Sequence, residues 1–292
     1  MAEVGFIGFG EAASAFQTGF QTATKPSATA YDVKLLSSEA KEEMRTRLSA
    51  YEVTECSSAA ELVSSSDKIF SLVTADQALA AAQSVAECDL SGRFYFDCNS
   101  CAPQTKKKAA RLIEAAGGNY IDVAVMAPVH PKLHHVPLSL SAPKAEEAAS
   151  ILSNLDMKPT VSGDAVGYAS AMKLTRSIAV KGLEALSAEL LLVASELGIQ
   201  DEVIASLDKS YPGFDWEKRG NYAFDRMMIH GKRRSAEMAE AAEMIKQLRL
   251  SSEMTNATVQ WQKAISELGE APKEEELSEI TARILKALSS RS

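Results

Sequence analysis

Three glycines near the amino terminus have the spacing of a loop that binds a dinucleotide. They lie in the segment Gly5-Phe-Ile-Gly8-Phe-Gly10-Glu-Ala-Ala13, which follows a short apolar run typical of a strand and precedes a helix-like stretch, 11–22. Gly8 would permit the tight turn, Gly10 would let the backbone approach a pyrophosphate at the helix N-terminus, and Ala13 would let the helix pack closely on the sheet. The alternative is an ordinary glycine-rich turn.

A carboxylate at the end of the next predicted strand supports the first interpretation. Asp32 follows Gly10 by 22 residues, the distance at which an acid accepts hydrogen bonds from the adenosine ribose. A carboxylate repels a 2′-phosphate, so Asp32 favours NAD over NADP. Lys34 and Ser37 lie just beyond it and could instead hold that phosphate.

The elements that would carry these residues alternate along the first half of the chain. Alternating strands and helices of this length are typical of βαβ units and a mainly parallel sheet. We therefore predict an α/β fold with a Rossmann-type sheet domain over residues 1–162. The predicted strands are 4–7, 28–32, 51–54, 68–74, 93–97, 120–123 and 137–141, and the predicted helices are 11–22, 38–49, 57–65, 76–87, 103–116 and 144–154.

The second half has a different character. From Ala165 to Leu197 there is no proline, and apolar residues recur at helical spacing up to Gly198, which stands in the position of a C-cap. We predict one long interdomain helix over 165–197. The remaining stretches, 201–207, 222–248, 252–268 and 274–289, also have helical patterns, so residues 163–292 are expected to form an all-α domain. The charged stretch from Lys273 onward is expected to be a solvated helix.

Composition narrows the class of protein. The chain has 292 residues, 46% of them apolar, and a formal net charge of −8, which is typical of a globular protein and not of a disordered one. The acid excess argues against a nucleic-acid or anionic-membrane partner. No apolar stretch approaches the ~20 residues that span a bilayer, and the amino terminus lacks the features of a signal peptide. We expect a cytoplasmic protein.

Cysteine and histidine spacing does not predict a metal centre. Cys98 and Cys101 form a single C-x-x-C pair with no second pair and no histidine at zinc spacing. His130, His134 and His135 cluster in a proline-bounded segment; they could ligate a metal or line the mouth of a cleft, but a surface loop is the expected outcome. We predict no metal.

Four stretches of the chain resemble the β-hydroxyacid dehydrogenases, which include 3-hydroxyisobutyrate and 6-phosphogluconate dehydrogenases. The first is the glycine loop. Asp97-Cys-Asn-Ser-Cys-Ala-Pro103 is similar to the family's Asp-x-Ser-Thr-x-x-Pro, and Asp122-Val-Ala-Val-Met-Ala-Pro128 stands where the family has Asp-Ala-Pro-Val-Ser-Gly-Gly. Gly163-Asp-Ala-Val-Gly-Tyr-Ala-Ser-Ala-Met-Lys173 is similar to Gly-x-x-Gly-x-Gly-x-x-x-Lys, with Gly163 displaced by one position and Ala169 in place of the third glycine.

The resemblance implies that Lys173 is the catalytic residue. A lysine is protonated in water at neutral pH, with a pKa of ~10.4, and desolvation in a closed cleft lowers that value. The amine could then take a proton from an alcohol and return it in the reverse direction. The alternative is an ordinary lysine on a helix surface.

Two departures from the family pattern concern the substrate. The family has Asn four residues after the lysine, where this chain has Ser177, and Arg176 adds a nearby charge. Met126-Ala127-Pro128 replaces Ser-Gly-Gly, so we expect a larger or more apolar substrate. The predicted substrate contacts are Asn99, Ser100, Val125, Met126, Ala127, Pro128, Arg176, Ser177 and His230.

A basic helical stripe in the second half remains open to two interpretations. Arg226, His230 and Arg233 or Arg234 fall on one helix face and could grip a carboxylate or phosphate, or they could form a solvated basic surface. Arg233 falls where the family has a late lysine near the nicotinamide. With it, the predicted cofactor contacts are Gly8, Phe9, Gly10, Glu11, Ala12, Ala13, Asp32, Val73, Thr74 and Arg233.

The predicted function is an NAD(P)-dependent oxidoreductase that moves a hydride between the nicotinamide and a hydroxyl-bearing acid of the β-hydroxyacid type. The expected partner is a small, anionic substrate, and the resemblance implies a homodimer. The chain is similar to a less characterised branch of the family that has its own C-terminal domain. Two alternatives remain: an imine reductase, which commonly has another residue in place of Lys173, and a non-catalytic nucleotide-sensing protein.

Overall fold

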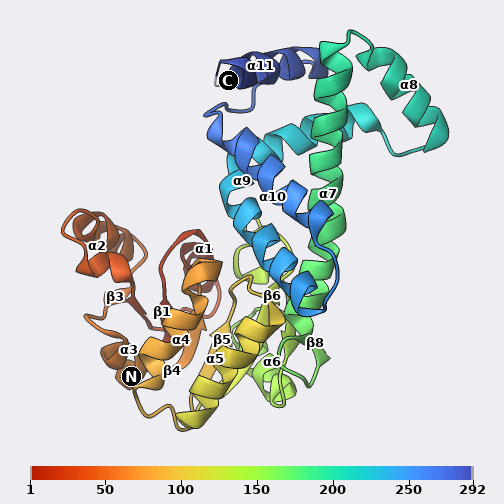
Figure 1. Ribbon diagram of the computed structural model, residues 1–292. Coiled ribbons are helices and arrows are strands. Elements are labelled where there is room, and N and C mark those ends of the chain that lie inside the picture. The colour runs from red at the N-terminus through yellow and green to blue at the C-terminus, as the bar shows by residue number, and fades with distance from the viewer. Residues whose placement is uncertain (1, 291–292) are drawn as a thin grey trace. The chain divides into compact units, whose positions relative to one another are not determined.

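The sheet of the amino-terminal half is mainly parallel, as predicted. The computed structural model describes residues 2–290, and within them eight strands form one sheet in the order β3-β2-β1-β4-β5-β6-β7-β8 (Figure 1). All neighbouring pairs are parallel except β6 and β7. The strands are β1 (Ala2–Ile7), β2 (Ala28–Tyr31), β3 (Thr54–Glu55), β4 (Ser66–Ser71), β5 (Phe94–Asp97), β6 (Asn119–Val125), β7 (Pro137–Ser141) and β8 (Lys158–Gly163).

Successive residues of a strand point to opposite sides of the sheet, and helices pack against the apolar side chains on both faces. On one face, Phe6, Phe70 and Phe96 pack in a buried cluster with residues of α1, α2 and α6. On the other, Ile69 and Tyr95 pack with residues of α3, α4 and α5. The bounds are α1 (Glu11–Thr22), α2 (Lys41–Ala50), α3 (Ala59–Ser65), α4 (Ala78–Ala86), α5 (Pro103–Ala115) and α6 (Ala145–Asn154), with short 3₁₀ turns η1 (Val33–Leu36), η2 (Ala75–Gln77) and η3 (Leu133–His135).

The carboxyl-terminal half is helical, again as predicted. The long helix α7 (Tyr168–Glu196) is followed by α8 (Gln200–Ser210), α9 (Trp216–Gln247), α10 (Glu253–Glu267) and α11 (Leu277–Ser289). Gly198, with φ of 69°, follows α7 in the left-handed conformation expected beyond a helix end. The chain divides into two compact units, one reaching to Lys173 and the other beginning at Leu174. The boundary near residue 162 and the domains 1–162 and 163–292 stay predictions.

Two sequence-based expectations need correction. The last charged stretch is not simply a solvated helix, because α11 buries Leu277, Ile280 and Ile284 in a cluster with residues of α7, α9 and α10. Strand β8 was not expected, because Lys158–Gly163 is only partly buried and contains a proline, as edge strands do. Among residues 2–290, no helix combines the length and the apolar character needed to cross a bilayer.

Candidate active site

Most of the predicted site residues in the first half of the chain lie at the ends of four adjacent parallel strands, β1, β4, β5 and β6. Ile7 of β1 pairs with Ser71 of β4, Ser71 with Asp97 of β5, and Asp97 with Asp122 of β6. Because the carboxyl ends of parallel strands share an edge, the segments that follow these strands lie together there. Ligands of open α/β sheets bind at this edge, where the strand order reverses, and here that reversal falls between β1 and β4.

The glycine loop has the backbone that its sequence predicts. Gly8 has a φ of 80°, and a Cβ at this position would lie 2.7 Å from the carbonyl oxygen of Leu72, so only glycine fits. A Cβ on Gly10 would meet nothing within 4 Å, which leaves open space at the N-terminus of α1. Gly10 is the N-cap of α1 and has no side chain to bind the first amides of the helix. Ala13, in the first turn of α1, is fully buried.

The side chain of Asp32 helps to hold the glycine loop in place. Its Oδ2 accepts a hydrogen bond from the amide of Phe9 at 2.8 Å, and its Oδ1 accepts one from the amide of Lys34 at 2.9 Å. The carboxylate is 9% exposed. Because each oxygen has a second lone pair, Asp32 can anchor the loop and still accept from a ribose hydroxyl. The loop, the open helix N-terminus and this acid together fit a dinucleotide.

Asn99 ties the strand ends to one another. Its Oδ1 accepts from the amide of Val73 at 2.7 Å, and its Nδ2 donates to Ser71 Oγ at 2.9 Å and to Asp97 Oδ1 at 2.8 Å. The side chain is 4% exposed. The side-chain amide of Asn99 is thus hydrogen-bonded within the protein, where it positions the ends of β4 and β5. A contact between Asn99 and the substrate stays a prediction. The neighbouring Thr74 is exposed.

A buried lysine lies between two buried aspartates beneath this edge. Lys106 of α5 has no exposed surface; its Nζ lies 2.9 Å from Asp97 Oδ1 and 3.5 Å from Asp122 Oδ1, and donates to the carbonyl of Asp97 at 2.7 Å. Burial alone would lower the pKa of Lys106, but the two carboxylates outweigh it and raise that pKa. Tyr120 donates to Asp97 Oδ2 at 2.6 Å, so a hydrogen bond supplements the single cation that the two carboxylates share.

Asp122 also caps the helix that carries Lys173. Its Oδ2 accepts from the amides of Gly167 at 3.1 Å and Ser170 at 3.0 Å, and its Oδ1 accepts from Ser170 Oγ at 2.5 Å. Ser141 donates to the same carboxylate and accepts from the amide of Ala169. A carboxylate at a helix N-terminus satisfies free amides and complements the helix dipole. The start of α7 is therefore fixed to β6 and β7.

The start of α7 also packs against Asp97–Pro103, the second of the four segments that carry the family resemblance. Gly167 has a φ of 96°, and a Cβ there would lie 3.0 Å from Cβ of Pro103 and 3.2 Å from its carbonyl oxygen. Glycine is therefore needed at this position, both for the backbone conformation and for the close approach. The segments Asp97–Pro103 and Gly163–Lys173 meet at this contact.

The consequence is that Lys173 reaches the strand-end motif. Its Nζ donates to Ser100 Oγ at 2.7 Å, although 73 positions separate the two residues. Both side chains are partly exposed. An amine within hydrogen-bond distance of a hydroxyl can chemically exchange a proton with an alcohol placed beside it.

Comparison with known proteins agrees with this geometry. Residues 3–132 match the model of the NAD binding domain of 6-phosphogluconate dehydrogenase, and residues 194–265 match a domain of unknown function, DUF1932. A conserved hypothetical protein from Sinorhizobium meliloti 1021 is 31% identical, with a TM-score of 0.78 over 100% of this chain and 97% of its own. The chain belongs to the β-hydroxyacid dehydrogenase family. Its branch is the one in which an NAD-binding domain precedes a DUF1932 domain.

Two further structures place the branch beside the dehydrogenases. The conserved protein MTH1747, whose structure is described as similar to 3-hydroxyacid dehydrogenases, is 29% identical with a TM-score of 0.71, over 91% of this chain and 97% of its own. The 3-hydroxyisobutyrate dehydrogenase of Mycobacterium tuberculosis is 13% identical with a TM-score of 0.72, over 97% of this chain and 99% of its own. The second likeness concerns the fold alone.

The segment predicted to contact the substrate, 125–128, lies at the surface of the sheet unit. Val125, Met126 and Ala127 are partly exposed and Pro128 is exposed, and the amide of Met126 donates to the carbonyl of Pro137 at 2.9 Å. These residues lie at the end of β6 and beyond it, at the same sheet edge as Ser100.

Two further predicted substrate contacts lie in the helical unit. Ser177 is buried and its Oγ accepts from Lys181 at 3.1 Å, whereas Arg176 is exposed.

Acidic partners neutralise part of the basic stripe on α9. Arg234 is buried and paired with Glu184, and Arg233, which is 53% exposed, pairs with Glu237. Lys181 lies 2.9 Å from that glutamate; burial lowers its pKa despite this partner. Two of the charges that suggested an anion-binding site are thus paired with acids within the helical unit.

Arg226 and His230, the other members of the stripe, are only partly buried on the same helix. Arg226 lies with its guanidinium carbon 6.0 Å from the ring centroid of Tyr222. These two residues therefore retain the exposure that contact with a small molecule would require.

Sequence reasoning missed the residues that hold the site together, namely Lys106 and Ser141, and the capping role of Asp122. A usable signal existed for Asp122, which lies inside an apolar strand where an unpaired acid would be costly. Lys106 had none, because it begins a run of three lysines that looks like a solvated surface.

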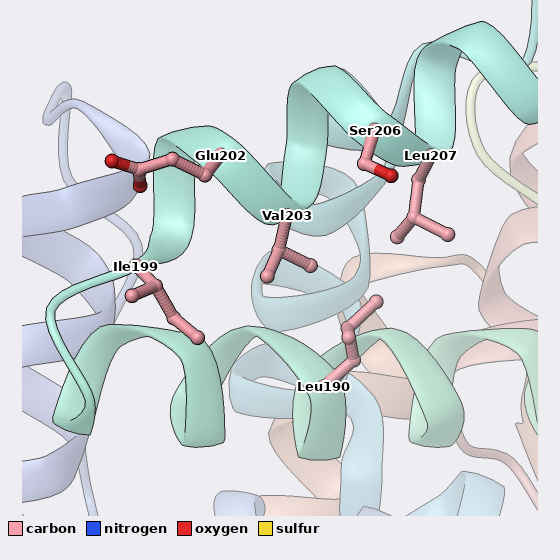
Figure 2. Close-up of a pocket in the computed structure, with 6 residues that line it drawn as sticks. All are labelled: Leu190, Ile199, Glu202, Val203, Ser206 and Leu207. Atoms are coloured by element: carbon pink, nitrogen blue, oxygen red, sulfur yellow. The ribbon is translucent and has the colours of Figure 1, made fainter.

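Cys98 and Cys101 flank Asn99 and Ser100 in the segment that follows β5. Both cysteines are buried and form no disulfide, and burial raises the pKa of the Cys98 thiol to about 12, which disfavours the reactive thiolate. A pocket of about 360 Å³ lies between α7 and α8 and is lined by Leu190, Ile199, Glu202, Val203, Ser206 and Leu207 (Figure 2). None of these six residues is a predicted site residue.

Proposed function

We propose that this protein is an NAD(P)-dependent oxidoreductase that acts on the hydroxyl group of a small anionic substrate of the β-hydroxyacid type. The observation that carries the proposal is the hydrogen bond from Lys173 to Ser100, at the sheet edge that also bears the dinucleotide loop. The family and the NAD-binding domain support the class of reaction.

The residues divide the work as follows. The amides at the start of α1 and the carboxylate of Asp32 would hold the pyrophosphate and the adenosine ribose. The bound nicotinamide supplies the acceptor or donor of the hydride. Lys173 would take the hydroxyl proton during oxidation and return it during reduction, and Ser100, already hydrogen-bonded to its Nζ, would orient the substrate oxygen.

The cofactor preference rests on the same edge. Asp32 presents a negative charge next to the ribose position, and the following residue, Val33, is apolar and 66% exposed. Neither would bind a 2′-phosphate. We infer a preference for NAD over NADP.

The test is a Lys173→Ala variant assayed with NAD and a panel of β-hydroxyacids, following NADH formation. We expect turnover to fall by about 10²–10⁴-fold, the usual worth of a general acid–base group, while NADH binding stays within about twofold. Thr175→Ala, an exposed substitution on the same helix, is the control and should retain full turnover.

Two outcomes count against the proposal. Undiminished turnover in Lys173→Ala would remove the lysine from its role. Tight NADH binding by the wild type, with no turnover on any member of the panel in either direction, would favour a nucleotide-sensing protein.

We also propose that the protein forms a homodimer through α7. Val180, Leu183, Leu186 and Val193 are 37–55% exposed and recur at helical spacing along one side of the helix. A row of exposed apolar residues of this length marks an association surface. A Leu186→Glu variant should therefore elute as a monomer in size-exclusion chromatography with light scattering; a wild-type monomer at micromolar concentration would refute the dimer.

A further inference from the structure

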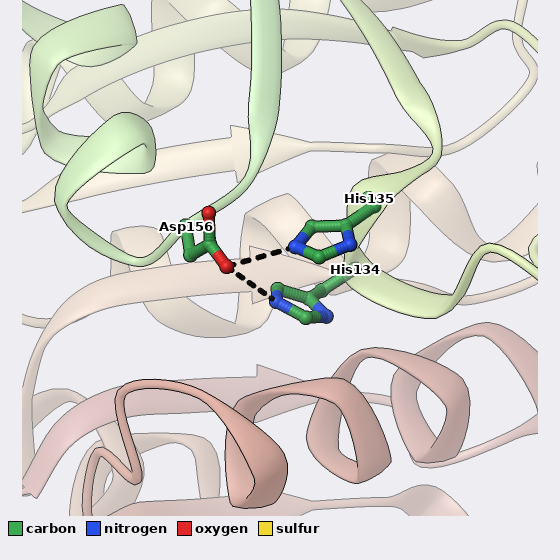
Figure 3. A group of neighbouring side chains, drawn as sticks. All are labelled: His134, His135 and Asp156. Carbon is green, nitrogen blue, oxygen red and sulfur yellow. Dashed lines mark hydrogen bonds and ion pairs between the residues drawn. The ribbon is translucent and has the colours of Figure 1, made fainter.

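Two histidines and an aspartate from separate connections meet on the sheet unit, away from the residues assigned to catalysis. His134 and His135 belong to η3, in the connection from β6 to β7, and Asp156 lies between α6 and β8. Figure 3 shows both imidazoles directed toward the same carboxylate. One ligand atom from each side chain lies within 4.8 Å of the others.

The separations suit a common ion. His135 Nε2 lies 2.8 Å and His134 Nε2 lies 3.7 Å from Asp156 Oδ2. Two ligand atoms that are each about 2.1 Å from a tetrahedral ion lie about 3.4 Å apart, between these two values. Modest side-chain rotations would therefore place all three atoms around one ion.

His134 is the most informative member of the group. It is 3% exposed, and neither ring nitrogen has a hydrogen-bond partner among residues 2–290. A buried polar group without a partner is costly, and a metal ion would supply the missing partner.

The surroundings hold the ring in place. A Cβ on Gly19 of α1 would lie 1.9 Å from His134 Nδ1, so the absence of a side chain there makes room for the imidazole. The ring of Phe20 packs edge-on against it, with centroids 5.5 Å apart. His134 thus lies between α1 on one side and His135 and Asp156 on the other.

The two carboxylate oxygens of Asp156 have different neighbours. Lys158 binds its Oδ1 at 2.8 Å, which leaves Oδ2 facing the imidazoles. Asp156 and His135 are 43% and 45% exposed, so water can complete the coordination shell.

We propose that His134, His135 and Asp156 bind a divalent transition-metal ion. Two imidazoles and one carboxylate with open positions suit Zn²⁺ and its neighbours rather than Mg²⁺ or Ca²⁺, which prefer oxygen ligands. The bound ion would join the β6–β7 connection, which begins with the predicted substrate loop, to the α6–β8 connection. Its role would be to fix that loop.

The experiment uses the full-length protein without an affinity tag, stripped with chelator and dialysed against Zn²⁺ at about 10 µM. Metal content is measured by mass spectrometry, and affinity by calorimetric titration with Zn²⁺. We expect one zinc per chain, and at least tenfold weaker binding in His135→Gln and in Asp156→Asn. Zinc should raise the melting temperature of the wild type by about 5 °C and leave that of His135→Gln unchanged.

The matched control is His130→Gln, an exposed histidine of the same connection that lies outside the group. It should bind zinc like the wild type. His135→Gln and Asp156→Asn alter half-exposed side chains, so both should fold, as circular dichroism would verify. Absence of stoichiometric zinc in the wild type, or equal binding in all variants, would overturn the proposal and leave the group as a structural ion pair.

Discussion

Replacing Lys106 by methionine tests whether the buried charges beneath the sheet edge hold the site. Methionine keeps most of the volume but removes the ammonium group that lies 2.9 Å from Asp97 and 3.5 Å from Asp122. Both carboxylates are at most 1% exposed, so neither can recover its hydration without local opening. The variant leaves two buried aspartates without their shared cation.

The magnitude follows from this burial. Removing one partner of a buried ion pair costs about 3–5 kcal/mol, a large part of the roughly 5–15 kcal/mol that stabilises a domain. At 2–4 °C per kcal/mol for a unit of this size, the melting temperature should fall by about 6–20 °C. The pKa of Lys106 is raised in the folded state, so its contribution is complete below the ordinary lysine pKa of ~10.4 and is lost only as the pH rises above it.

The assay is thermal unfolding followed by circular dichroism and calorimetry at neutral pH. Both tryptophans, Trp216 and Trp261, lie in the helical unit, so their fluorescence follows that unit while circular dichroism follows both. Lys107→Met, an exposed substitution one residue along the same helix, should change stability by less than about 0.5 kcal/mol.

A Lys106→Met variant as stable as Lys107→Met would refute this reasoning, because it would show that the two aspartates do not need the cation. The further variant Lys106→Met/Asp97→Asn removes one of the uncompensated charges. It should recover part of the lost stability.

Three further predictions concern the cofactor, a close approach and the thiols. Asp32→Asn removes the charge that disfavours a 2′-phosphate, so the ratio of NADPH to NADH dissociation constants should fall by about tenfold, measured by fluorescence titration. Gly19→Ala should destabilise the protein by about 1–3 kcal/mol, because its Cβ would overlap a buried imidazole. Gly182→Ala, whose nearest non-local neighbour would be 3.9 Å away, should stabilise α7 by about 0.5–1 kcal/mol in chemical denaturation. Iodoacetamide at pH 8 should modify partly exposed Cys88 well before buried Cys98, whose pKa is about 12, as peptide mapping would detect.

Each of these has a control or a contrary result. Asp67→Asn, on the exposed surface of β4, should leave both dissociation constants unchanged. Equal stability of the two glycine variants would show that the space beside each glycine does not decide the outcome. Rapid labelling of Cys98 in the folded protein would contradict its burial.

The sequence was sufficient for the elements with a clear period and a start signal. β1, the glycine turn and α1 were predictable because an apolar run, a turn that only glycine adopts and an alanine-rich helix follow one another. The long α7 was predictable because only two widely spaced glycines interrupt its apolar period. β8 was not, since a partly buried edge strand has no strong alternation of apolar and polar residues.

The site was predictable only in part, because its contacts join distant segments. No local pattern states that Lys173 meets Ser100; the resemblance assigned both residues to one site but did not predict their contact. The buried lysine is hidden in a run of three, and the pairing of His134 with Asp156 depends on how two connections pack. Asp156 has a φ of 58°, a local conformation that its sequence context does not indicate.

Two of the departures from the family pattern, Ala169 and the segment 126–128, have different consequences. Ala169, which replaces a glycine, is fully buried and gives its amide to Ser141 at 3.0 Å, so its methyl group fits without disturbing the capped start of α7 or the placement of Lys173. Met126, Ala127 and Pro128 instead change exposed or partly exposed surface at the sheet edge. The first departure leaves the proposed proton-transfer group in place, whereas the second alters what can lie against it.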